Sequence, residues 1–350
     1  MPSANAYRAL YGVGLGALGL AAIIAASLGA KSSTVQSEAP IGVTGSPALS
    51  WQQLMGGSVQ ARKAGAIREA ENLLQQAADL AASFDPHDMR RAQTRLGQAE
   101  FYLWRGRPEL AERTYKEAVT LGELAGGPNN PGMVSLLEGL ANFYYYRDRY
   151  DEVVPIYSRI LEIVRAVTPG DPHEEARRLR NLALVYQLQG KHAQAQPQFL
   201  EALRLVEANP NPFAAEVAEY LQAAAEGYRA WGKARLAVPL AARALEIVER
   251  DAGPTSLDVV PYLKTLADAR MAAGQHRRAA PLYERAVAIV ERISGAEHTD
   301  LEPYLLGLAA AQRAQGNIHE ADANLVRAKK IIGTESSSTA QAARPGAPIQ

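Results

Sequence analysis

The sequence predicts an all-α fold: a right-handed α-solenoid of about seven stacked antiparallel helix pairs, preceded by an N-terminal transmembrane helix. Three observations support this prediction. A residue pattern returns every 42 residues, each repeat holds two apolar faces with helical spacing, and a long uncharged stretch lies near the N-terminus. The chain has 350 residues, of which 47% are hydrophobic, so it carries enough apolar material to bury a large core.

The first element is the uncharged stretch. It runs from Ala9 to Ala30, between Arg8 and Lys31. A helix of this length would span roughly 33 Å, close to the thickness of a bilayer core. We therefore expect residues 1–31 to form a transmembrane anchor or an uncleaved signal, with residues 9–30 in the membrane. The alternative is a cleaved secretory signal, which would give a secreted protein.

The charges that flank this stretch predict its orientation. Arg8 and the α-amino group outweigh Lys31, which favours an N-terminus on the cytoplasmic side. A single-pass protein would then hold its repeat domain on the extracytoplasmic side, which is the periplasm if the organism is bacterial. Residues 32–50, rich in Ser, Thr, Gly and Pro, are expected to form a flexible linker. Residues 334–350 have few bulky apolar side chains and are expected to form a disordered tail.

The region 51–333 between these segments contains the repeat. One residue marks each copy, and successive markers lie 42 residues apart, except that the first precedes the second by 41. The markers are Gly65, Gly106, Asp148, Gly190, Gly232, Gly274 and Gly316. A marker that is nearly always glycine suits the positive φ that follows a helix C-terminus.

Residues around the marker define two helices. Small residues recur seven positions before it and five and twelve positions after it, as in Ala183, Ala195 and Ala202, and large apolar residues recur nine after it, as in Phe199. These spacings place one apolar face on each helix, and the small residues allow the two backbones to approach closely. A single pair cannot bury both faces, so the copies must stack into a solenoid.

This pattern resembles the tetratricopeptide repeat (TPR). The best match is Asn181-Leu-Ala-Leu-Val-Tyr186, followed by Gly190-Lys-His-Ala-Gln-Ala195 and Phe199. The 42-residue period is similar to the kinesin-light-chain variety. That variety carries a proline where the second helix opens. The matching prolines are Pro155, Pro197, Pro239 and Pro281. The resemblance covers about residues 51–333 and implies a fold used for binding proteins.

Composition excludes several classes of function. The absence of cysteine excludes disulfides, thiolate catalysis and cysteine-based metal sites. Lys+Arg and Asp+Glu both count 37, and this balance argues against a nucleic-acid partner. The histidines recur at repeat offsets typical of turns and helix caps; they are His87, His173, His192, His276, His298 and His319. We therefore expect no catalytic residue, no metal, no cofactor and no small-molecule substrate.

The concave groove of such an array is lined by the first helix of each pair. Residues expected there lie two to thirteen positions before a marker, and they are Asn142, Tyr145, Tyr146, Arg177, Arg180, Asn181 and Arg229. Asparagine can pair with an extended backbone, and arginine can bind a carboxylate. Two asparagines at these offsets resemble the carboxylate clamp of chaperone-binding TPR proteins, but Glu138 and Glu219 stand where that clamp has basic residues.

These observations predict a membrane-anchored TPR scaffold that binds a protein or peptide partner in its concave groove and is not an enzyme. A structural subunit of a larger membrane complex is the alternative, in which the array serves for packing. The sequence gives no convergent set of titratable residues typical of an active site.

Overall fold

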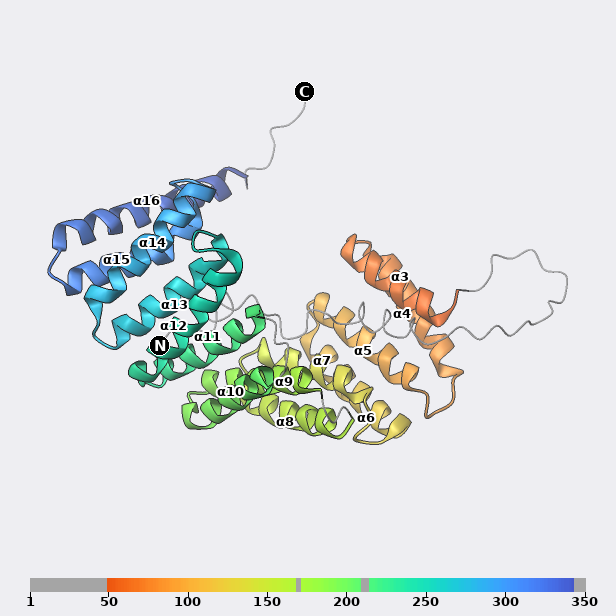
Figure 1. Ribbon diagram of the computed structural model, residues 1–350. Coiled ribbons are helices and arrows are strands. Elements are labelled where there is room, and N and C mark those ends of the chain that lie inside the picture. The colour runs from red at the N-terminus through yellow and green to blue at the C-terminus, as the bar shows by residue number, and fades with distance from the viewer. Residues whose placement is uncertain (1–48, 168–170, 209–213, 343–350) are drawn as a thin grey trace, which may run out of the picture. The chain divides into compact units, whose positions relative to one another are not determined.

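The computed structural model describes residues 49–167, 171–208 and 214–342, with side chains as far as residue 332. Within these ranges the chain forms fourteen α-helices and two short 3₁₀ helices, with no strand (Figure 1). The chain divides into two compact units, Met1–Asp171 and Pro172–Gln350. The predicted all-α fold of paired helices is therefore confirmed for the part of the chain that the structure describes.

The first unit contains three helix pairs. Their bounds are α3 Trp51–Lys63, α4 Ile67–Ala82, α5 Met89–Trp104, α6 Pro108–Gly126, α7 Met133–Tyr145 and α8 Tyr150–Val167. The second unit contains four pairs, with a 3₁₀ turn before each of the last two. Their bounds are α9 Pro172–Leu188, α10 His192–Glu207, α11 Ala214–Ala230, α12 Ala234–Ala252, η1 Leu257–Val259, α13 Val260–Ala272, α14 His276–Ser294, η2 Thr299–Leu301, α15 Glu302–Ala314 and α16 Ile318–Ala342.

The marker residues turn the chain between the two helices of each pair. All six marker glycines have positive φ, between 70° and 88°, and Asp148 reaches a φ of 58° without being glycine. Each turn is closed by a backbone hydrogen bond from the residue after the marker, as from Lys191 N to the Tyr186 carbonyl at 2.8 Å. The positive φ that the sequence predicted at these positions is confirmed.

The small residues also lie where the repeat predicts them. Ala183, Ala195 and Ala202 are each at most 1% exposed, and Ala195 packs in one cluster with Phe199 and Ala223. The residues at the same offsets in the other repeats are buried as well. The close approach of the paired helices therefore depends on side chains no larger than alanine or valine at most of these positions.

We expect Ala195→Leu to lower the free energy of unfolding by about 1–3 kcal/mol, because added methylene groups overpack a site without space. Ala193 lies two residues away on the exposed side of α10 and provides the control. Denaturant unfolding followed by circular dichroism measures both variants. Equal midpoints for Ala195→Leu and Ala193→Leu would contradict the assigned helix face.

The four repeat prolines lie further into the second helix than expected. Because each second helix begins two residues after its marker, Pro155, Pro197, Pro239 and Pro281 lie in the second turn rather than the first. All four are exposed, so the ring faces solvent and the lost amide donor does not leave a buried group without a partner.

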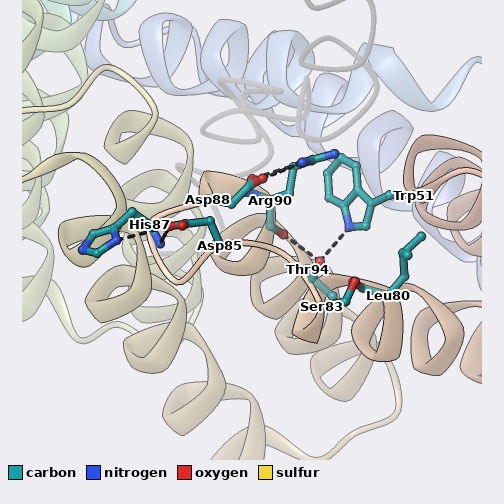
Figure 2. A network of polar contacts seen from close by, with 8 residues as sticks. All are labelled: Trp51, Leu80, Ser83, Asp85, His87, Asp88, Arg90 and Thr94. Carbon is teal, nitrogen blue, oxygen red and sulfur yellow. Dashed lines mark hydrogen bonds and ion pairs between the residues drawn. The ribbon is translucent and has the colours of Figure 1, made fainter.

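Histidine-containing linkers start the next pair of helices, as Figure 2 shows for the first unit. Asp88 caps α5 by accepting a hydrogen bond from Arg90 N at 2.9 Å, and the Asp85 carboxylate accepts one from His87 N at 2.8 Å. Thr94, on the same helix, accepts a 2.8 Å hydrogen bond from the Trp51 indole and so joins α5 to α3. The interpretation of these histidines as linker and cap residues fits this geometry.

The first helix of each pair lies on the inner side of its unit. In the second unit α9, α11, α13 and α15 contact one another in succession, and in the first unit α3, α5 and α7 do the same. Successive second helices contact one another much less. This difference curves each stack toward its first helices, whose free faces form the inner surface of that unit.

The predicted anchor, residues 1–31, and most of the predicted linker lie outside the described residues. No helix among those that are described combines the length and the apolar character needed to cross a bilayer. At the other end, the backbone of α16 stays helical to Ala342, past the point where we predicted the tail to begin, and residues 343–350 lie outside the described part.

Candidate partner-binding surface

A row of polar side chains follows the inner surface of the second unit, where an ordinary helix interface would be apolar. We call it the inner polar row. Its members come from α9, α11 and α13 and are Arg180, Asn181, Glu219, Gln222, Glu226, Arg229, Lys264, Thr265 and Asp268. Because buried polar groups cost free energy unless they are paired, the partners of these side chains decide what the row can bind.

The α9 end of the row holds hydrogen-bonding capacity that is not used. Asn181 is 5% exposed, and within the described chain its Oδ1 has no hydrogen-bond partner. Arg180 places Nη1 3.6 Å from Glu219 Oε2 and its guanidinium 5.6 Å from the Tyr220 ring centroid. The Nε of Arg180 is buried and likewise has no partner among described residues. One donor and one acceptor on α9 are therefore without a hydrogen bond among the described residues.

The middle of the row is a hydrogen-bonded cluster across α11 and α13. The Gln222 amide donates to Thr265 Oγ1 at 2.9 Å, and Thr265 Oγ1 lies 3.1 Å from Glu226 Oε1. Glu226 is 8% exposed. Burial raises the pKa of Glu226 to about 7, although the positive charge of Arg229 and the Thr265 hydrogen bond act in the opposite direction.

The α13 end of the row is more fully paired. Lys264 Nζ lies 2.7 Å from Asp268 Oδ2, and the Tyr283 hydroxyl donates to the other oxygen of the same carboxylate. Burial and the nearby Asp268 charge raise the pKa of Tyr283, so this phenol stays protonated. These side chains hold one another in position, so the polar groups at this end of the inner polar row already have partners within the chain.

Four of the seven predicted groove residues belong to this unit. Arg180, Asn181 and Arg229 lie in the inner polar row, and Arg229 Nε is buried without a hydrogen-bond partner in the described ranges. Arg177 lies one turn before Arg180 and is half exposed, with Nη2 2.7 Å from Glu174 Oε2. Reaching a partner would therefore require Arg177 to leave or share this carboxylate.

The other three predicted residues belong to the first unit. Asn142 lies on α7 and is partly buried, and its Oδ1 has no hydrogen-bond partner in the described chain. Tyr145 is buried, whereas Tyr146 is 47% exposed, and their rings meet edge to face at 5.6 Å. Tyr145 also contacts the Tyr150 ring at 5.8 Å. In the first unit, the predicted residues therefore provide the Asn142 amide and the exposed Tyr146 ring. We consider these two separately from the inner polar row of the second unit.

Thr265 was missed by the sequence analysis, although it connects Gln222 and Glu226. It lies nine residues before its marker, the same offset as Asn181. The polar residue at this shared offset could therefore have identified Thr265 as a member of the inner polar row. Among the described residues, no three His, Asp or Glu side chains come together in a way that could hold a metal ion.

The tetratricopeptide repeat family model matches four segments of the sequence. They are residues 90–166, 132–208, 174–250 and 259–332. Together these segments cover more than half of the chain. No curated protein matches the sequence.

Several solved structures resemble the fold. BtubC (BKLC) from P. vanneervenii aligns with a TM-score of 0.53 at 19% identity, covering 74% of this chain and 95% of that one. A protein from Podosopora anserina, described as a kinesin light chain with nearly identical TPR-like repeats, aligns at 0.52 and 20% identity, covering 59% and 97%. The signal transduction ATPase PH0952 from Pyrococcus horikoshii, which has a TPR sensor, aligns at 0.64 and 18% identity, covering 83% and 43%.

At these identities the likeness extends to the fold alone. The family model, the positive-φ markers and the buried small residues agree on the same repeat. The chain belongs to the tetratricopeptide repeat family.

Proposed function

We propose that the chain is a non-catalytic scaffold that binds an extended segment of a partner protein along the inner surface of its second unit. The fold is one typical of protein–protein interaction. The observation that carries the proposal is that one side-chain atom in each of Asn181, Arg180 and Arg229, on the first helices of this unit, is buried without a hydrogen-bond partner among the described residues. A bound backbone would satisfy these atoms once the surrounding side chains move to expose them, and this would remove the cost of leaving them unpaired.

The proposal extends to the membrane. Residues 9–30 anchor the chain as a single span and place the repeats on the extracytoplasmic side, periplasmic in a bacterium. Their uncharged length and the excess positive charge on the N-terminal flank support this. Anchoring raises the effective concentration of the scaffold near membrane partners. Mature protein that begins between Ser27 and Lys31 would instead support secretion after cleavage.

The proposed binding surface is tested by removing the positive charges of α9. We expect Arg177→Gln with Arg180→Gln to weaken binding at least tenfold to peptides selected from a displayed random library. We expect the thermal midpoint to change little, because the exposed Arg177–Glu174 pair contributes about 0–1 kcal/mol and the buried Nε of Arg180 makes no hydrogen bond that the change would remove. Titration of each purified variant with the selected peptide measures the affinity.

The matched control lies on α12, a second helix of the same unit. Arg243 pairs with Glu207 at 2.6 Å and is half exposed. Arg243→Gln with Arg250→Gln removes two exposed arginines of α12, which matches the charge change of the double variant, so it should leave peptide affinity unchanged. Full affinity in the double variant, or equal loss in the control, would place binding elsewhere on the chain.

The alternative is a structural subunit of a membrane complex. Size-exclusion chromatography of detergent-solubilised native protein separates the two functions. A scaffold that binds transiently elutes near its own mass, whereas an integral subunit elutes only with its complex.

A further inference from the structure

A pocket lies at one edge of the second unit, outside the inner polar row. It is formed by residues 274–278, which make the turn from α13 into α14, and by Ala314 and Gln315 at the end of α15. Its volume is about 420 Å³, within the range of small-molecule sites, roughly 300–1,000 Å³. We call it the edge pocket.

The charge of the edge pocket is positive and not compensated. Arg277 and Arg278 line it and are exposed, and within the described ranges neither forms an ion pair. No carboxylate is among the lining residues. Other arginines of the second unit, such as Arg243, Arg285 and Arg327, pair with a glutamate.

A third arginine adds positive charge next to Arg278. Arg270 on α13 donates from Nη1 to the Arg278 carbonyl at 3.1 Å. The pKa of Arg270 is lowered, first by burial and then by the positive charge of Arg278. The two guanidinium groups thus repel one another, and a bound anion would relieve this repulsion.

The walls of the edge pocket are fixed before any ligand enters. The Gln315 amide donates to the His276 carbonyl and to the Ala311 carbonyl, both at 3.2 Å, and so ties α15 to the start of α14. Gln275 N donates to the Arg270 carbonyl at 2.8 Å. A site whose backbone is already held loses less conformational entropy on binding.

We propose that the edge pocket binds a small organic phosphate, held by the guanidinium groups of Arg277 and Arg278. A planar guanidinium donates two parallel hydrogen bonds to phosphate oxygens, and two arginines match the charge of a phosphate dianion better than that of a single carboxylate. The volume of about 420 Å³ admits a ligand larger than a bare phosphate ion, so a small organic phosphate fits. The sequence alone suggested no small-molecule ligand, so this site would add a ligand class to the partners expected for the chain.

The repeat itself supplies the matched control. Arg235 occupies in the previous repeat the offset that Arg277 occupies here, but Leu236 replaces the second arginine and Tyr228 replaces Arg270. The turn before α12 therefore has the same backbone, with Lys233 and Arg235 as its basic residues and without the three arginines at the edge pocket. Arg235→Gln with Arg250→Gln removes two exposed arginines of α12 and matches the charge change of Arg277→Gln with Arg278→Gln.

Isothermal titration of the full chain at low salt tests the proposal, with ribose 5-phosphate, pyrophosphate, glutarate and tetraglutamate as probes. We expect saturable binding of ribose 5-phosphate, at least tenfold weaker in the Arg277/Arg278 variant and unchanged in the Arg235/Arg250 variant. Thermal midpoints verify that both variants fold. No saturable phosphate binding, or equal loss in both variants, would overturn the proposal. Binding of glutarate or tetraglutamate but of neither phosphate would also overturn it, in favour of a carboxylate site.

Discussion

Phe199→Ala is expected to lower the free energy of unfolding by about 3–5 kcal/mol, the usual cost of truncating a buried aromatic residue. Phe199 is 1% exposed and packs against Ala195 of its own helix, Ala183 of α9 and Ala223 of α11. Its ring therefore joins two successive repeats. Because a solenoid is stabilised mainly between neighbours, this cavity should weaken the array at the α9–α11 junction in particular.

Leu200→Ala is the control for this loss. Leu200 is the next residue on the same helix but is 39% exposed, so its truncation leaves little cavity. Denaturant unfolding compares the two variants, and hydrogen exchange locates the weakened repeats. The packing scheme is wrong if Leu200→Ala costs as much as Phe199→Ala.

The second large effect is a fall in stability between about pH 4.5 and pH 7 caused by Glu226. Burial raises the pKa of Glu226 to about 7 in the folded chain. The folded state therefore keeps a proton that the unfolded chain has already released, and the free energy of unfolding falls as pH rises through this window. A pKa raised from 4.5 to about 7 corresponds to a loss of about 3 kcal/mol, which is complete about one unit above pH 7.

Glu226→Gln isolates this contribution because it keeps the shape and the hydrogen bond to Thr265 but removes the titration. The charged groups that act on Glu226 are Arg229, Lys264 and Asp268, and all three are unchanged in the variant. Unfolding of both proteins is measured from pH 4.5 to 8. The stability of the wild type relative to the variant should fall with pH, and a flat or rising difference would show that Glu226 is ionised when folded.

The repeat geometry was predictable because it depends on local spacing. A glycine at the marker permits positive φ, and an alanine at a fixed offset permits close helices, whichever repeat contains them. Asp148 follows the same rule, with a positive φ held by the surrounding turn. The prolines were predicted one turn too early because the sequence shows the repeat offset but not the residue at which a helix begins.

The polar surfaces were only partly predictable. Arg180, Asn181 and Arg229 were identified from their offsets, but their unused hydrogen-bonding atoms depend on neighbours more than thirty residues away. The raised pKa of Glu226 depends on burial between α11 and α13, and the edge pocket depends on Arg270 reaching the Arg278 carbonyl across a turn. Such convergence follows from stacking and not from the spacing of one helix. A single surface that joins Asn142 and Asn181 stays a prediction.

The central claim is that the second unit binds its partner on the inner surface. Site-specific photocrosslinking in the native membrane tests it most directly, with a photoreactive residue at Gln222 in the inner polar row or at Arg243 on α12. We expect a crosslink from position 222 that a peptide of the captured partner competes away, and none from position 243. A competed crosslink from position 243, with none from position 222, would contradict it.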